Sequence, residues 1–107
     1  MIKRVSIITL PEGTDPDVFW QYWLEVHAAA VKKLPGLKRY VISRAVSQPI
    51  GEIKFWGMVE TWWDSPEDFQ RAFSTPEGKE AADDFWPRVA NRGSVFMEEH
   101  QVELSKP

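Results

Sequence analysis

Cysteine is absent from this 107-residue chain, and histidine occurs only twice. Without cysteine there are no disulfide bonds and no thiolate chemistry, which fits a reducing cytoplasm. Two histidines without cysteine do not make a zinc site of the usual kind, so no metal is predicted.

Long apolar runs and basic stripes are also lacking. No stretch approaches the roughly 20 apolar residues of a membrane span, and the first residues lack the features of a signal peptide. The net charge is −3 with both signs interspersed, which argues against a nucleic-acid partner. We find no Gly-rich phosphate loop, nucleophile elbow or dinucleotide-binding fingerprint, and we therefore expect no cofactor.

Aromatic residues are abundant instead: they make up 13% of the chain, with six Trp and six Phe. The length suits one domain spanning residues 1–107. One layer of helices on one sheet would struggle to bury so many large rings. A second buried surface is therefore expected, either an oligomer interface or an apolar cavity.

Hydrophobic alternation and turn residues predict the order of elements. Helix starts are indicated at Thr14 or Asp15, at Ser65 and at Thr75, and Pro87 should kink or end the last helix. Strands are predicted over residues 2–10, 37–46, 53–63 and 94–104, and helices over 16–33 and from 65 onward with a break near 74.

The order β-α-β-β-α-β predicts an α+β fold of the ferredoxin-like type. Right-handed connections then give a four-stranded antiparallel sheet with both helical segments on one face. Because apolar side chains alternate onto both faces of the strands, the other face must also be covered. A second copy packed sheet to sheet is the simplest cover, so a homodimer is predicted.

The segment FWQYWLEVHAAAVKKLPG, residues 19–36, is amphipathic. At about 100° per residue, Val26 and Ala30 fall on its apolar arc with Phe19 and Trp23, and His27 lies at the edge. A titratable ring there is either a packed core histidine or the acid/base group of a pocket. Burial against tryptophans would lower its pKa and favour the neutral base.

Three further residues are candidates for chemistry. Tyr40 is either a hydroxyl donor to a substrate oxygen or a core aromatic. Glu60, a carboxylate within an apolar strand, either orients His27 or substrate, or pairs with Arg39 or Arg44 across strands. His100 is interpreted mainly as a residue of the sheet edge or dimer interface, with a place in the pocket as the alternative.

Three segments resemble the EthD family of the dimeric α/β-barrel superfamily: FWQYWLEVHAAAVKKLPGLKRY, MVETWWDSPEDF and EEHQVEL. The resemblance implies a ferredoxin-like dimer and cofactor-free acid/base chemistry by the helix histidine. One relative in this family is a muconolactone methylisomerase, and the resemblance places its active-site histidine, tyrosine and glutamate at His27, Tyr40 and Glu60. That relative has a second active-site histidine in the loop between the second and third strands. This chain lacks it, since residues 47–52 contain no histidine.

The preferred hypothesis is a cofactor-independent lyase or isomerase acting on a small, largely apolar, oxygenated compound such as a lactone, phenolic or polyketide-like acid. His27 would move a proton, Tyr40 would stabilise an oxyanion, and Glu60 would orient His27 or the substrate. A non-catalytic binding protein and a cofactor-free monooxygenase are the alternatives. The expected pocket lies between the first helix and the sheet and is lined by Trp20, Trp23, Trp56 or Trp62, and Phe85.

Overall fold

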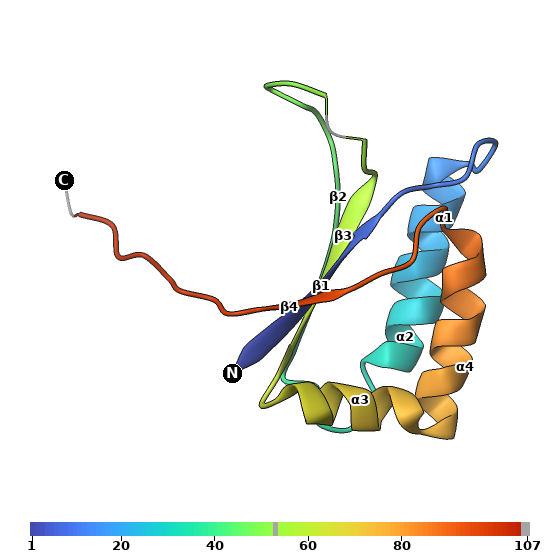
Figure 1. Cartoon of the computed structure of the whole chain (residues 1–107). Coiled ribbons are helices and arrows are strands. Elements are labelled where there is room, and N and C mark those ends of the chain that lie inside the picture. Colours follow the sequence, from blue (N-terminus) through green and yellow to red (C-terminus); the bar gives the residue numbers. More distant parts are fainter. Residues whose placement is uncertain (53, 106–107) are drawn as a thin grey trace.

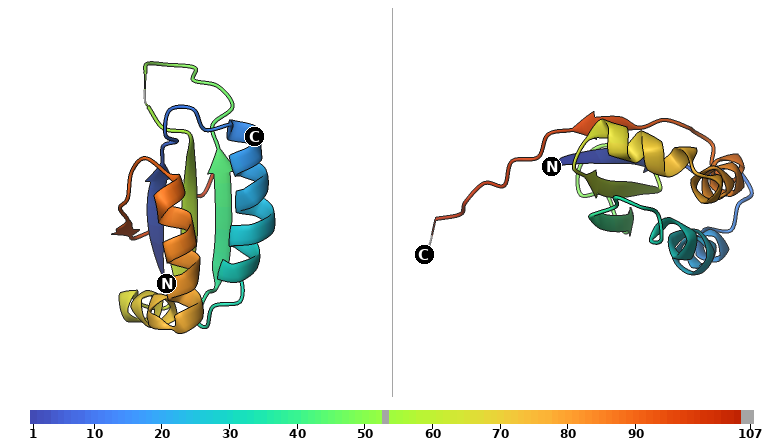
Figure 2. Two further views of the ribbon diagram at one scale, coloured as in Figure 1. Left: turned by 90° about the vertical axis from the view of Figure 1, so that its right-hand side faces the viewer. Right: turned by 90° about the horizontal axis from the view of Figure 1, so that it is seen from below.

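The computed structural model describes residues 1–52 and 54–105 and shows a four-stranded antiparallel sheet of order β2-β3-β1-β4. All the helices lie on one face of the sheet (Figures 1 and 2). The predicted ferredoxin-like α+β fold is thus confirmed. In chain order the elements are β1 (Ile2–Ile8), α1 (Pro16–Tyr22), the π-helical η1 (Trp23–His27), α2 (Ala28–Val31), β2 (Arg39–Arg44), β3 (Gly57–Trp63), α3 (Pro66–Ser74), α4 (Pro76–Phe85), the 3-10 turn η2 (Trp86–Arg88) and β4 (Val95–Met97).

Side-chain caps define the helix starts. The Asp15 carboxylate accepts hydrogen bonds from the first amides of α1, so Asp15 rather than Thr14 is the cap. Ser65 and Thr75 cap α3 and α4 in the same way, and each is followed by a proline. Such a cap typically stabilises a helix by about 1 kcal/mol. Pro87 lies in η2, directly after α4, as its lack of an amide hydrogen requires.

The sheet face beneath the helices carries the core. Because side chains alternate along a strand, Arg4, Ser6 and Ile8 of β1 face the helices. On β3, Thr61 lies opposite Arg4 and Val59 opposite Ser6, and both are buried on the same face as Trp63. The core divides into two clusters, one around Trp23 and Phe85 and the other around Trp63 and Leu34.

The opposite face carries no helix in the described part of the chain (Figure 1). Val5 and Trp62 are buried there, but Ile7, Val95 and Met97 are about half exposed, at 50%, 57% and 46%. An apolar sheet face of this kind normally requires a cover.

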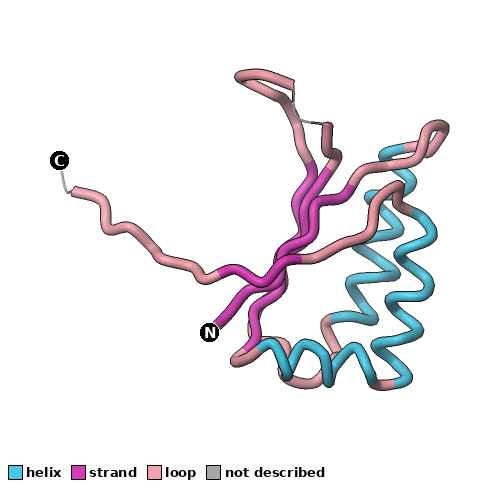
Figure 3. The backbone as a smooth tube through the Cα atoms, in the orientation of Figure 1, coloured by secondary structure: helices cyan, strands magenta, loops and turns pink. Residues whose placement is uncertain are grey.

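All four strands are shorter than expected: β1 and β2 each lack two or more of their predicted end residues, and β4 differs most. The last strand comprises Val95–Met97 rather than residues 94–104, because the chain from 98 to 105 leaves the sheet and is exposed (Figure 3). The third strand begins at Gly57 rather than at residue 53, which lies outside the described residues.

Candidate functional site

A π-helical turn places His27 at the centre of the buried side of its helix. The Ala28 amide donates to the Trp23 carbonyl, a span of five residues instead of the usual four. In a regular α-helix, residues four apart are rotated by somewhat more than one full turn, so they move gradually off one face. A π turn rotates the chain less per residue and compensates for this excess rotation. The buried residues therefore recur at every fourth position: Phe19, Trp23, His27 and Val31.

This geometry corrects the apolar arc that ideal α-helical rotation predicts. Val26, expected on the arc, is 56% exposed, and Ala30 is also exposed. His27, expected at the edge, is only 9% exposed.

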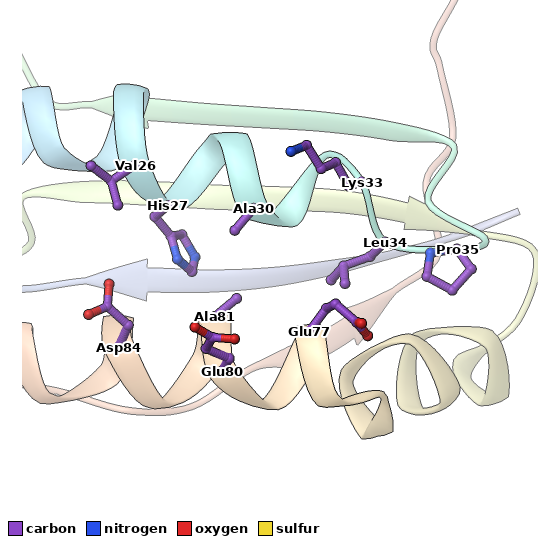
Figure 4. A pocket seen from close by; sticks show the side chains of 10 residues that line it. All are labelled: Val26, His27, Ala30, Lys33, Leu34, Pro35, Glu77, Glu80, Ala81 and Asp84. Atoms are coloured by element: carbon purple, nitrogen blue, oxygen red, sulfur yellow. The ribbon is translucent and has the colours of Figure 1, made fainter.

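The His27 imidazole projects from the first helical segment toward α4 (Figure 4). It stacks on Phe85 with ring centroids 4.3 Å apart and planes 25° apart. Its Nδ1 atom is buried and makes no hydrogen bond to any described residue.

His27 borders a small, partly open cavity of about 30 Å³ between the helices and the sheet. That volume suffices for roughly two water molecules. The lining residues are Arg4, Trp23, His27, Val31, Tyr40, Val59, Phe73, Ala82, Phe85 and Trp86.

Four buried polar atoms without a hydrogen-bond partner among residues 1–52 and 54–105 belong to residues of this cavity. They are Arg4 Nε, Trp23 Nε1, His27 Nδ1 and the Tyr40 hydroxyl. Buried polar groups are nearly always hydrogen-bonded in folded proteins. Within this set, the Trp23 indole lies near enough to the Tyr40 oxygen to lower the Tyr40 pKa as a weak hydrogen-bond donor would. Arg4 Nε, His27 Nδ1 and the Tyr40 hydroxyl hydrogen still lack partners among the described residues, so the cavity is arranged for polar atoms from outside this part of the chain.

The site fixes the protonation of its groups at neutral pH. Burial, reinforced by the Arg4 charge and opposed by Asp84, lowers the pKa of His27 to about 4, so the imidazole is neutral. Burial raises the pKa of Tyr40 to about 12 against the effects of Arg4 and the Trp23 indole, so the phenol keeps its proton. Burial also lowers the pKa of Arg4, but only to about 10, and the guanidinium stays charged.

Two larger grooves adjoin the cavity. One, of about 600 Å³, runs between the first helical segment and α4, and His27 lies in its wall (Figure 4). The other, of about 390 Å³, lies between the α3–α4 pair and residues 92–94, and Arg4 lies in its wall.

Of the predicted pocket residues, His27, Tyr40, Trp23 and Phe85 surround the cavity. Trp20 and Trp56 are not among the cavity-lining residues; both rings pack against Trp23, with centroids 5.9 Å from it.

Glu60 and Trp62 lie on the opposite face of the sheet, which corrects their expected place beside His27. Both alternate along β3 with Thr61 and Trp63, which face the helices, so neither can reach His27 within one chain. Glu60 pairs with Lys3 at 3.0 Å rather than with Arg39 or Arg44. The Trp62 indole donates to Glu99, and His100 lies on the exposed segment that follows.

Arg4 is the site residue that the sequence analysis missed. One signal was available in the sequence. Arg4 shares a strand face with Ser6 and Ile8, and an arginine on a strand face that becomes buried is rare unless its charge is paired or has a function. Its proximity to His27 depends on the packing of β1 under α4, which strand periodicity does not give.

Among the described residues, no three His, Asp or Glu side chains gather in a group that could hold a metal ion. Likewise, no described helix has the length and hydropathy of a membrane span.

A model of the EthD domain matches residues 11–85 of the chain. The chain belongs to the EthD family. The resemblance of the sequence to EthD proteins is thereby confirmed. An EthD family protein of Bacillus halodurans is 32% identical, with a TM-score of 0.74 over 94% of this chain and 99% of that one. An uncharacterized 11.0 kDa protein of Rhodococcus erythropolis is 27% identical over 92% of this chain and 96% of its own length.

More distant solved structures share the fold of this EthD protein. A protein of unknown function from Thermobifida fusca, described as dimeric and ferredoxin-like, is 19% identical with a TM-score of 0.72, over 90% of this chain and 88% of that one. SnoaB from Streptomyces nogalater, a cofactor-independent oxygenase solved as a mutant, is 17% identical with a TM-score of 0.71, over 94% of each chain.

Proposed function

We propose that this EthD protein is a cofactor-independent lyase or isomerase that moves a proton on a small, largely apolar, oxygenated compound. The observation that carries the proposal is the neutral His27 imidazole, whose Nδ1 has no partner among the described residues, beside the Tyr40 hydroxyl and the Trp23 indole at one cavity.

In this mechanism His27 Nδ1 takes a proton from a carbon next to a carbonyl, and the electrons of that C–H bond move onto the carbonyl oxygen. The Tyr40 hydroxyl and the Trp23 indole donate hydrogen bonds to the resulting oxyanion. His27 then returns the proton to another carbon in an isomerase, or to a departing oxygen in a lyase. A positioned acid/base group of this type typically contributes 10²–10⁴-fold to the rate.

The apolar wall supports the same chemistry. Val31, Val59, Phe73 and Phe85 exclude water, which strengthens each hydrogen bond to the developing charge. Because the cavity is small, it suits the reacting oxygen of a substrate, and the remainder of the molecule would lie in an adjoining groove.

A homodimer is part of the proposal. The exposed apolar side chains on the helix-free face of the sheet support it, as does the dimeric description of the Thermobifida fusca protein. In a sheet-to-sheet dimer each His27 cavity stays within one chain, on the far side of the sheet from the interface.

The test is a turnover screen without added cofactor against phenolic acids, β-keto acids and unsaturated lactones, with products identified by mass spectrometry. We expect turnover in air and under nitrogen alike, and a loss of at least about 100-fold in His27→Gln. The matched control is His100→Gln, which replaces the chain's other histidine at an exposed position and should keep full activity.

Other outcomes identify the alternatives. Turnover that requires oxygen and consumes it would favour an oxygenase, the activity named for SnoaB. Binding without turnover, unchanged in His27→Gln, would favour an accessory binding protein. Turnover unaffected by His27→Gln would refute the mechanism.

A further inference from the structure

Arg4 is a buried cation that no carboxylate of the described chain neutralises. It is only 6% exposed, and no Asp or Glu within residues 1–52 and 54–105 lies at ion-pair distance from it. Its Nη1 donates to the Ser6 hydroxyl at 3.2 Å, and its Nε has no partner among the described residues.

The surroundings of Arg4 hold it in place without cancelling its charge. The guanidinium lies over the Phe69 and Phe73 rings, 5.2 Å and 5.8 Å from their centroids. Ser6 is in turn hydrogen-bonded to Ser94. Contacts with neutral groups recover only part of the cost of removing a charge from water. The Arg4 guanidinium would therefore be stabilised most by an anion that binds to it from solvent.

The two grooves differ in the charge that they present to such an anion. The groove beside Arg4 carries Lys79 and Arg92 against the single acid Asp83. The groove beside His27 carries three acids, Glu77, Glu80 and Asp84, against Lys33. An anion is therefore attracted to the Arg4 groove and repelled from the other one.

We propose that Arg4 binds the carboxylate of a small organic acid, which enters along the groove lined by Lys79 and Arg92 and extends toward His27. The inference rests on the proposed function, because it makes this acid the substrate on which His27 acts. The guanidinium offers Nε and Nη donors side by side, a geometry that matches the two oxygens of a carboxylate.

The bound carboxylate would also change His27. The Arg4 charge is one of the causes that lower the pKa of His27. A carboxylate that neutralises Arg4 removes this effect, so the imidazole becomes a stronger base when substrate is present.

The test uses benzoate as the probe and benzamide as its neutral analogue of similar shape. We expect benzoate, but not benzamide, to raise the melting temperature of the protein in a concentration-dependent way. Arg4→Met should fold, because it replaces a buried charge by an apolar chain of similar length, and it should bind benzoate at least tenfold more weakly. Arg71→Met is the matched control, since it removes an arginine whose side chain is 72% exposed on α3.

A second measurement separates ligand binding from a purely structural role of Arg4. In His100→Gln protein, His27 is the remaining imidazole and can be titrated by NMR. Saturating benzoate should raise the pKa of His27 in this background. In the double variant that also carries Arg4→Met, the pKa of His27 should be the same with and without benzoate.

Three results would overturn the inference. They are equal binding of benzoate and benzamide, benzoate binding that is unchanged in Arg4→Met, and no detectable benzoate binding at concentrations of about 10 mM. The proposed function would survive those results if a neutral compound showed turnover dependent on His27. Benzoate binding at Arg4 without any turnover dependent on His27 in the screen would instead uphold the anion site and count against the proposed catalysis.

Discussion

At the scale of single residues, the burial of a neutral His27 should make the protein less stable at acidic pH. The charged and titratable groups around the ring are Arg4 from β1, Tyr22 from α1, Tyr40 from β2 and Asp84 from α4. Burial and Arg4 keep the folded pKa near 4, against a usual value of 6.5. Between these two values the unfolded chain binds a proton at His27 and the folded chain does not. The free energy of unfolding therefore decreases as the pH falls through this window.

The corresponding prediction compares urea unfolding of the wild type and His27→Gln at pH 7 and pH 5. From the window above, His27 should account for about 2 kcal/mol of the stability lost by the wild type between these two pH values. The variant lacks the titrating group and should lose less by that amount. Parallel losses in the two proteins would show that the folded imidazole is not held neutral.

The sequence was informative about residues whose type was unusual for their position. His27 and Tyr40 are such residues, and the structure brings both to one cavity. Glu60 was also unusual, but its face of the sheet was not fixed relative to the helix by strand periodicity alone, since both faces of β3 are rich in apolar residues. The approach of Arg4 to His27 arises from tertiary packing of β1, the first helical segment and α4 around one cavity.

At the scale of elements, the π-helical η1 explains why an ideal helix misplaces the buried face. A π turn equals an α-helix with one inserted residue, and such insertions are common at functional sites. The exposed Leu24 lies within this turn, 46% accessible, between the buried Trp23 and His27.

Deleting Leu24 should convert the π turn into a regular α-helical one. Trp23 and His27 would then be three positions apart, which still keeps both on the buried face. We expect the free energy of unfolding to change by about 1 kcal/mol or less, whereas the displaced imidazole should lower turnover by about 100-fold.

Thermal unfolding followed by circular dichroism and the turnover assay would measure both effects. Leu24→Ala is the control, since it keeps the number of residues and should preserve activity. Full activity in the deletion variant would show that the π turn does not position His27.

Helix ends were predictable because caps and prolines act locally, and Asp15, Ser65 and Thr75 all cap helices as the sequence indicates. The end of β4 was not predictable in the same way. Alternating Val102 and Leu104 are typical of a strand, but a strand requires a neighbour, and within the predicted strand 94–104 only Val95–Met97 pair with β1.

At the scale of the whole molecule, the two faces of the sheet differ in what they present. One face, with the helices, holds the His27 cavity, and the other exposes the apolar side chains of Ile7, Val95 and Met97, which the proposed second copy would cover. Light scattering should therefore give about twice the chain mass of 12.4 kDa.

Val95→Glu should shift this dimer toward the monomer, because it places a charge on the helix-free face. Val18→Glu is the matched control: Val18 is similarly exposed, 64% against 57%, but lies on α1. Dissociation by both variants, or by neither, would count against a sheet-to-sheet dimer.

The position of β1 in the sheet also bears on the synthesis of the protein. β1 is translated before the other strands, yet it lies between β3 and β4, and Lys3 pairs with Met97 of the last strand. Phe85 and Trp86, which close the cavity over β1, are likewise translated late. On the ribosome, the cavity around Arg4 is therefore incomplete until α4 and η2 have emerged, and a nascent chain stalled before α4 has neither the β4 partner of β1 nor a site.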